Sequence, residues 1–383
     1  MSTTATQQPA PAPAPKPARG ERAVNPLTTG HLPGWSIWVI LAGALLVGFL
    51  VVWLMQMLAP GEEGGFNVAG ALILGAIIYL IAVWAISRAV EGSRQATNRF
   101  MTSLVILAFV IALIPLVSLI VTLFTNGMAR MDATFFSSSM QGVMPSEKGG
   151  AVHAIWGTVL ITLTATLISV PVGIFTAIYL VEYGKGGWLS KSINFLVDVM
   201  TGIPSIVAGL FIFAMAMLIA DYTALDYTEV KTGFAGALAL SILMLPTVIR
   251  STEEMLRLVP MDLREASYAL GVPKWLTIVK VVLRTALAGI ATGVTLAISR
   301  VIGETAPLLI ATGYWPMMNT NLTEFQMASL PVFVYQMTKG QGPAQVPWME
   351  MAWTAALVLL IIVMLLNLIA RLIAWAARPK GSR

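Results

Sequence analysis

The most constraining feature of this sequence is a succession of apolar runs, each long enough to cross a lipid bilayer. A membrane-spanning helix needs about 20 consecutive, mostly apolar residues, and eight segments reach or approach that length. These segments are 35–58, 66–86, 101–125, 154–180, 195–220, 233–249, 286–312 and 351–375. We therefore expect an all-α polytopic membrane protein with about eight transmembrane helices, since helices satisfy their own backbone hydrogen bonds within the bilayer.

The composition excludes several other classes of protein. Only 11% of the 383 residues are charged and 57% are hydrophobic, whereas ordinary soluble domains carry about 25% charged residues. A soluble globular protein is thereby excluded, and so is disorder over most of the length. The chain has no cysteine and no His-Glu-x-x-His or clustered carboxylate set, so we expect no metal site. His153, at the mouth of a span, is expected to be a solvated interface residue.

The positions of the basic residues predict which side of the membrane each loop faces. If the N-terminus is inside, only Arg130, Lys148, Lys231 and Lys339 fall in outer loops, and Arg300 falls within a span; the rest of the 23 basic residues lie on the inner side. The positive-inside rule therefore favours eight spans with both termini in the cytoplasm. Because the net charge of +5 lies at the ends of spans, it indicates contact with the lipid bilayer and no nucleic-acid partner.

The order of these segments predicts the domain organisation. Residues 1–34 are rich in Pro and Ala and are expected to form a disordered cytoplasmic tail. A transmembrane hairpin is expected over 35–99, followed by a larger membrane domain over 100–375 and a short cytoplasmic tail over 376–383. The inner loop at 250–285 carries many basic residues and is expected to be structured.

Both ends of a short helix can be recognised within this inner loop. Asp262 and Glu265 have the spacing of a capping box, which predicts a helix over 263–270. Gly271 suits the left-handed position that follows a helix, and Pro273 stops the helix or starts the next one.

One face of this helix is apolar, because Leu263, Ala266 and Leu270 follow the i, i+3, i+7 pattern. So short a helix is unstable alone. It must be held by its own loop or docked into a groove on another protein. An amphipathic connector lying on the lipid headgroups is the alternative interpretation.

The spacing around this helix resembles the EAA loop of bacterial ABC-importer permeases, Glu-Ala-Ala-x3-Gly-x9-Ile-x-Leu-Pro. Here the run is Glu265-Ala-Ser, three residues, Gly271, nine residues, then Val281-x-Leu283. Ser267 replaces Ala, Val281 replaces Ile, and Arg284 replaces Pro, which removes only the kink that Pro would make.

Further motifs extend the resemblance in the family's order. They are Gly157-Thr-Val-Leu, Val170-Pro-Val-Gly-Ile, Ile178-Tyr-Leu-Val-Glu-Tyr-Gly184, Asp198-Val-Met-Thr-Gly-Ile-Pro-Ser-Ile-Val-Ala-Gly-Leu210, Leu245-Pro-Thr-Val-Ile-Arg-Ser-Thr-Glu-Glu254, Gly303-Glu-Thr-Ala-Pro-Leu-Leu309 and Met327-Ala-Ser-Leu-Pro331. Together they cover about residues 100–375 and resemble the PstA-type permease subunit of phosphate ABC importers. The run Gly-Glu-Thr-Ala-Pro is closer to PstA than to its partner permease PstC.

The resemblance implies a half-transporter with six core helices, to which the first two spans are an extension. The helix 263–270 would be a coupling helix seated on a cytoplasmic ATPase, with six ATPase-coupling residues: Leu263, Glu265, Ala266, Ser267, Leu270 and Gly271. The implied partners are a homologous permease of PstC type, an ATPase dimer of PstB type and an extracytoplasmic phosphate-binding protein of PstS type. The implied location is the bacterial cytoplasmic (inner) membrane.

The sequence shows no ATP-hydrolysing site of its own. It contains no Gly-x4-Gly-Lys-[Ser/Thr] phosphate-binding loop, since Gly184-Lys185 is followed by Gly. We therefore expect a transport subunit that is not itself an enzyme and binds no cofactor, with ATP and Mg²⁺ used by the partner ATPase.

Two charged residues, Arg300 and Glu304, lie well inside an apolar span. Arg300 is fourteen residues beyond Ala286, about 21 Å along a helix, and a charge at a helix centre costs about 2.5–3.5 kcal/mol on insertion scales. The i, i+4 spacing predicts a shared helix face. Because a guanidinium matches the oxygens of phosphate, we predict a substrate-pathway site formed by Arg300, Glu304 and Thr305. Mutual neutralisation in a packed bundle, or pairing with a partner subunit, is the alternative.

Two other functions remain open from the sequence. A permease for another oxyanion would share these features, because the pocket is expected to be shared with the partner permease. A multi-span membrane enzyme is the less favoured alternative, since it needs a nucleophile beside a base, or a metal cluster, near one interface, and the sequence shows neither.

Overall fold

The computed structural model describes residues 32–58, 66–144, 147, 149–184, 186–223, 230–342 and 345–376. These residues form helices and connecting segments without a strand. Eight of the described helices are long and apolar enough to cross a membrane, which confirms the expected number: Ser36–Leu58, Val68–Val90, Ser93–Arg130, Val152–Tyr183, Ser205–Tyr222, Gly233–Arg257, Lys274–Val301 and Gln345–Ile369. The chain forms two compact units, Met1–Ser118 and Leu119–Arg383, and each is described by itself.

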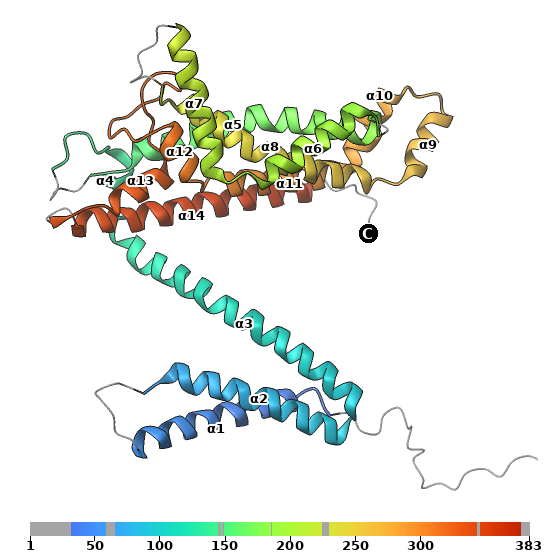
Figure 1. The fold of residues 1–383 in the computed structure, drawn as a ribbon, viewed down its shortest axis with the longest axis vertical. Coiled ribbons are helices and arrows are strands. Elements are labelled where there is room, and N and C mark those ends of the chain that lie inside the picture. Colours follow the sequence, from blue (N-terminus) through green and yellow to red (C-terminus); the bar gives the residue numbers. More distant parts are fainter. Residues whose placement is uncertain are drawn as a thin grey trace, which may run out of the picture. The chain divides into compact units, whose positions relative to one another are not determined.

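The first unit is built on a pair of closely packed helices, α1 (Ser36–Leu58) and α2 (Val68–Val90), which lie side by side (Figure 1). Two glycines stand where the helices approach closely: a Cβ atom on Gly48 would lie 2.6 Å from the backbone nitrogen of Gly75. Small residues allow membrane helices to approach this closely. Large apolar side chains such as Trp38 and Leu46 remain exposed on the outside, as expected for a lipid-facing surface.

A buried carboxylate fixes the turn between α2 and α3 (Ser93–Gly127). Glu91 accepts hydrogen bonds from the backbone nitrogen of Leu32 at 2.6 Å and from Ser87 Oγ at 2.7 Å, and it forms an ion pair with Arg99 at 2.6 Å. Burial by itself raises the pKa of the Glu91 carboxyl, but these three partners outweigh it and hold the pKa below its usual value.

The centre of the second unit is a bundle of three helices, α5 (Val152–Ile178), α8 (Gly233–Arg257) and α11 (Leu283–Val301). Small residues again bring two of them together, because a Cβ atom on Gly173 of α5 would lie 2.7 Å from Val248 of α8. The core between the three helices is made of fully or almost fully buried apolar residues, including Ile161, Ala165, Leu240, Met244, Ala297 and Val301. Among the eight candidate spans, α8 is the most deeply buried.

The fifth expected span, 195–220, is wrong as a single helix. The structure has two helices there, α6 (Trp188–Gly202) and α7 (Ser205–Thr223), and only α7 is a candidate span. Pro204 has no backbone N–H and disfavours helical geometry in the residue before it. Ile203 accordingly has an extended conformation, with φ −71° and ψ 125°.

The seventh expected span, 286–312, is also interrupted. Helix α11 ends at Val301, and a separate short helix, α12 (Ala306–Ala311), follows it. The four residues between them include Glu304. By contrast, Pro115, Pro171 and Pro246 remain within continuous helices, so proline alone does not predict where a span breaks.

The two ends of the second unit carry different short elements (Figure 1). One end, called here the α9 end, carries α9 (Met261–Ala269) and α10 (Lys274–Thr277). The opposite α13 end carries the turn Met128–Arg130, α4 (Ala133–Ser137), α13 (Leu330–Met337) and the start of α14 (Gln345–Ala376).

The α13 end is a packed core and not a set of open loops. Its buried apolar residues include Phe135, Met140, Phe333, Met337 and Met351. His153 lies among them, only 1% exposed, with its ring centroid 5.6 Å from that of Phe333 and 6.2 Å from that of Tyr314. The expectation that His153 is a solvated interface residue is therefore wrong.

Candidate functional site

The short helix α9 is present, but it begins differently from the prediction. It starts at Met261 with Pro260 as the preceding cap residue, and no side chain caps it. The expected capping box of Asp262 and Glu265 is therefore not formed. Pro260 accounts for this, because proline readily precedes or opens a helix and its fixed φ starts the helix two positions earlier than expected.

The end of α9 confirms the predicted stop signals. Gly271 has a positive φ of +77°, its backbone nitrogen donates to Tyr268 O at 2.9 Å, and the nitrogen of Val272 donates to Ser267 O at 3.2 Å. These two bonds are the pair that define a Schellman motif. Pro273 then serves as the N-cap residue of α10, so the helix is closed firmly at this end.

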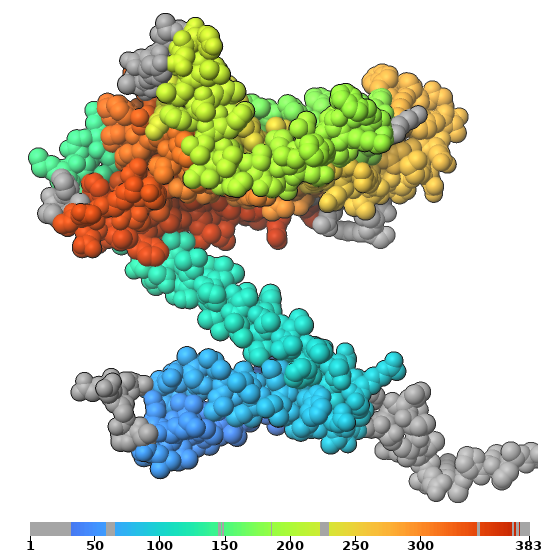
Figure 2. All heavy atoms as spheres, viewed as in Figure 1, coloured from blue at the N-terminus to red at the C-terminus, as the bar shows by residue number. Residues whose placement is uncertain are grey.

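One face of α9 is open to its surroundings. Leu263 is 43% exposed, Leu270 is 83% exposed, and Ala266 and Glu265 are also exposed. The space-filling view shows this segment protruding from the α9 end of the unit (Figure 2). Exposed apolar groups on a protruding helix are suited to docking in a groove of another protein.

Another side of α9, which is covered by the rest of the chain, is buried and polar. Ser267, predicted to contact an ATPase, is only 8% exposed, and its hydroxyl lies 2.8 Å from that of Thr277. It therefore joins α9 to α10 within this chain. Arg264, which the sequence reasoning missed, is 6% exposed and donates to Glu182 Oε1 from Nη2 at 3.0 Å and from Nε at 3.2 Å.

A second charged network joins α6 to α8 near the same end. Arg250 donates to Asp198 Oδ1 at 2.5 Å and to Glu253 Oε2 at 2.7 Å, and Glu253 also accepts from Arg257 at 2.5 Å. These groups border a hollow of about 370 Å³ lined by Asn194, Asp198, Arg250, Glu253, Glu254 and Arg257. Both arginines of this hollow are paired with carboxylates, so it offers no free cation to an anionic ligand.

The predicted pathway residues are arranged differently from expectation. Arg300 lies in the last turn of α11 and is exposed, whereas Glu304 is half-buried and lies beyond the helix end. Their predicted position on one helix face is wrong, because the helix stops at Val301. Within the described residues no ion pair joins them, and the Arg300 side chain has no hydrogen-bond partner.

Thr305 stands at the start of α12, where it is the N-cap residue without a side-chain capping bond. Together with Gly303 it borders a hollow of about 360 Å³, otherwise lined mainly by apolar residues of α13 and α14. The break between α11 and α12 therefore brings Thr305 to a cavity, while Arg300 is exposed.

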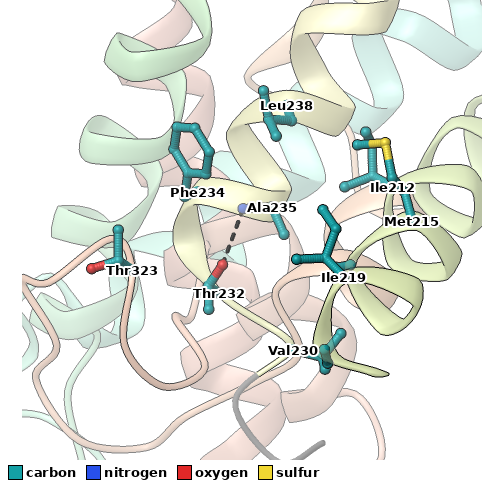
Figure 3. Close-up of a pocket in the computed structure, with 11 residues that line it drawn as sticks. Ile212, Met215, Ile219, Val230, Thr232, Phe234, Ala235, Leu238 and Thr323 are labelled. Atoms are coloured by element: carbon teal, nitrogen blue, oxygen red, sulfur yellow. Dashed lines mark hydrogen bonds between the residues drawn. The ribbon is translucent and has the colours of Figure 1, made fainter. Parts of the chain in front are cut away.

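The hollow drawn in Figure 3 has a different character. It measures about 220 Å³, lies between α7, α8 and the segment around Thr323, and has mostly apolar walls such as Ile212, Met215 and Leu238. The Thr232 hydroxyl is already engaged, since it accepts a hydrogen bond from the backbone nitrogen of Ala235 at 3.1 Å. Its lining holds no charged residue, so this hollow is not suited to an oxyanion.

Comparison with known proteins identifies the family to which the chain is similar. Residues 169–379 match the family described as binding-protein-dependent transport system inner membrane component. The chain is 44% identical over 286 residues to the phosphate transport system permease protein PstA 1 of Mycobacterium tuberculosis, covering 74% of this chain and 90% of that protein. It is 40% identical over 285 residues to the PstA protein of Pasteurella multocida, covering 73% of this chain and 95% of that protein.

Two solved structures have the same fold. One is a bacterial ABC transporter involved in the import of alginate, with a TM-score of 0.53, 14% identity and coverage of 74% of this chain and 98% of that chain. The other is a bacterial alginate ABC transporter in complex with its alginate-bound periplasmic protein, with a TM-score of 0.52, 16% identity and coverage of 73% and 97%. The sequence and fold matches agree: this chain belongs to the family of binding-protein-dependent transport system inner membrane components and, within it, to the PstA-type permeases.

Proposed function

We propose that this chain is the transmembrane permease subunit of an ATP-driven phosphate importer, forming half of the translocation path and coupling to a separate ATPase through α9. The observation that carries this proposal is the 44% identity to a phosphate transport system permease over 90% of that relative's length. The exposed apolar face of α9, on a helix whose other face is fastened to the chain, supports the coupling part.

The proposal assigns the remaining parts of the importer to other chains. A homologous permease of PstC type completes the path, an ATPase dimer of PstB type hydrolyses ATP with Mg²⁺, and an extracytoplasmic protein of PstS type delivers phosphate. In this arrangement Leu263, Ala266 and Leu270 fill a groove of the ATPase, and the exposed Glu265 forms an ion pair with a basic residue at its rim.

Arg300 is proposed to contact phosphate in the path. Its guanidinium is exposed and free of a partner within the described chain, so its donors are available to an anion. Glu304, on the non-helical segment that follows, limits how tightly the site retains phosphate and accepts a hydrogen bond from the protonated anion. Thr305 adds a hydroxyl beside the same break.

The proposed function is tested by transport. The chain is expressed with its three partner components in a bacterium that lacks its own phosphate importers, and uptake of labelled phosphate is measured with and without excess arsenate, sulfate or molybdate. We expect ATP-dependent phosphate uptake that requires this chain. Uptake of sulfate or molybdate without uptake of phosphate would instead show a permease for another oxyanion.

The proposed orientation has an independent test, because the chain contains no cysteine. A single Glu265→Cys substitution can be labelled with a membrane-impermeant maleimide. We expect labelling in inverted membrane vesicles and none in intact spheroplasts, with a Phe325→Cys variant giving the reverse pattern. Labelling of Cys at 265 from outside would contradict both the orientation and the coupling role of α9.

A further inference from the structure

We propose that the ion pair between Arg264 and Glu182 is the link through which α9 moves α5. When the ATPase displaces α9, the movement then reaches the bundle through this pair as well as along the covalent chain to α8 and α11. This inference rests on the proposed function. It assigns Arg264 and Glu182 as positioning residues, which act on the transport path through the helices that they join.

The geometry of the pair is that of a fixed joint. Both side chains are 7% exposed, and two nitrogens of the guanidinium donate to the same carboxylate oxygen of Glu182, at 3.0 and 3.2 Å. The remaining donors of Arg264 reach the carbonyls of Val259 at 2.5 Å and Leu256 at 2.9 Å, at the end of α8. One side chain therefore fastens α9 to the ends of two bundle helices.

Glu182 is the part of this joint that belongs to α5. It lies in the π-helical turn Tyr179–Tyr183, which continues α5 without interruption. Such turns widen the helix locally and are frequent at functional sites. Lys274 of α10 strengthens the joint, because its ammonium group donates to the Glu182 carbonyl and lies 4.6 Å from the centre of the Tyr183 ring.

Helix α5 is suited to carry a displacement along its length. At its far end the hydroxyl of Thr158 accepts a hydrogen bond from the backbone nitrogen of Leu330, at the start of α13, at 2.7 Å. One residue earlier, a Cβ atom on Gly157 would lie only 1.9 Å from the carbonyl oxygen of Ala328. α5 is thus in tight contact with α9 at one end and with the α13 segment at the other, and close packing transmits strain.

A covalent route from α9 exists without this pair, so the two routes make different predictions. If α9 acts only through its chain neighbours, loss of the Glu182 charge leaves transport coupled to ATP hydrolysis. If the ion pair transmits the movement, loss of the Glu182 charge leaves the ATPase docked and active, but α5 no longer moves with α9. The decisive quantity is therefore the ratio of phosphate transported to ATP hydrolysed.

The experiment uses the complete importer, reconstituted in proteoliposomes with binding protein and phosphate. Glu182→Gln removes the charge but keeps an acceptor of the same shape. Arg264→Lys keeps the charge but loses the two-nitrogen contact of the guanidinium group. The double variant Glu182→Arg with Arg264→Glu restores a pair of opposite charges. Arg257→Lys is the matched control, because Arg257 is 66% exposed and, among the residues that the structure describes, forms its ion pair with Glu253 on its own helix.

We expect Glu182→Gln and Arg264→Lys to assemble, to keep ATP hydrolysis within about twofold of the unmodified complex, and to lose at least tenfold in phosphate transported per ATP. The charge-reversed double variant should recover part of that ratio, and Arg257→Lys should leave it unchanged. A normal ratio in both single variants overturns the inference. Loss of assembly in both single variants and in the double variant also overturns it, because the pair would then only maintain the fold.

The two levels of the proposal fail in different ways. Absence of phosphate uptake by the unmodified complex would contradict the proposed function. Normal uptake and a normal transport ratio in the variants would contradict only the role of the ion pair.

Discussion

Two arginines of the second unit differ in burial and in pairing: one at the α9 end and one at the end of α11. Arg264 is buried and fully paired, with one carboxylate and two carbonyls as acceptors. Arg300 is exposed and has no partner within the described chain. A buried, paired charge resists displacement because separating it leaves an uncompensated charge, whereas an unpaired guanidinium keeps its donors available. The first arrangement suits a mechanical joint and the second suits contact with an anion.

The largest expected effect is at the unpaired arginine. Arg300→Ala should reduce phosphate uptake by about 100-fold or more, because two charge-assisted hydrogen bonds of about 1.5 kcal/mol or more each are lost. The measurement is uptake of labelled phosphate by cells, with assembly followed by co-purification of the complex. Arg300→Lys, which keeps the positive charge but lacks the planar pair of donors of a guanidinium group, should retain part of the activity.

Arg257→Ala is the control for loss of an exposed arginine elsewhere on the unit, and its uptake should remain within about twofold of normal, since Arg257 is 66% exposed and Glu253 keeps its ion pair with Arg250. Normal uptake by Arg300→Ala would remove Arg300 from the pathway.

A smaller effect is expected on the exposed face of α9. Ala266→Trp places a bulky side chain in the middle of the apolar stripe, and uptake should fall by about tenfold, equivalent to about 1.4 kcal/mol of docking free energy. The check is uptake together with the amount of ATPase that co-purifies. Tyr268→Trp adds bulk on the other side of the same helix and should change neither quantity. Equal losses in both variants would show that α9 tolerates no added bulk anywhere.

The turn after α9 should respond mainly in stability. Gly271 has φ +77°, and a Cβ atom there would meet nothing within 4 Å, so Gly271→Ala should cost about 1–2 kcal/mol through backbone strain alone. Gly271→Asn should cost less, because Asn tolerates the left-handed region better. Thermal unfolding of the purified complex measures both variants. An Asn variant that is less stable than the Ala variant would contradict the backbone explanation.

The smallest expected effect is at Ser267, on the buried face of α9. Ser267→Ala removes one hydrogen bond to Thr277 and should lower the free energy of unfolding by about 0.5–1.5 kcal/mol. The docking of the ATPase should be unchanged, since Ser267 is only 8% exposed. A loss of co-purifying ATPase with unchanged thermal stability would place Ser267 on the docking face instead.

The spans were predictable from sequence because each is set by a local property, the length of an apolar run. Their interruptions were not. Pro204 breaks a helix while Pro171 and Pro246 do not, since neighbouring helices decide whether the freed backbone groups are satisfied. The end of α11 at Val301 depends in the same way on its packing.

The candidate sites were predictable only in part for a similar reason. The short helix and its glycine stop are encoded within a dozen residues, and both are found. Its buried face was missed because Arg264 and Glu182 are 82 positions apart. Arg264 lies to one side of the apolar stripe, whereas Ser267 is four residues from Leu263 and lies next to it. His153 was misjudged because its position at a span end gives no information on the residues of α13 that cover it.

The contact between Gly48 and Gly75 has a consequence for how this chain can change over time. Because α1 and α2 bury small residues against each other and present bulky side chains outward, the seam between them needs no polar contact within the hydrocarbon. A seam of this kind tolerates changes on its bulky, lipid-facing side, since the backbone groups remain satisfied within each helix. Substitutions at Gly48 or Gly75 should therefore disturb the hairpin far more than substitutions among its outward-facing side chains.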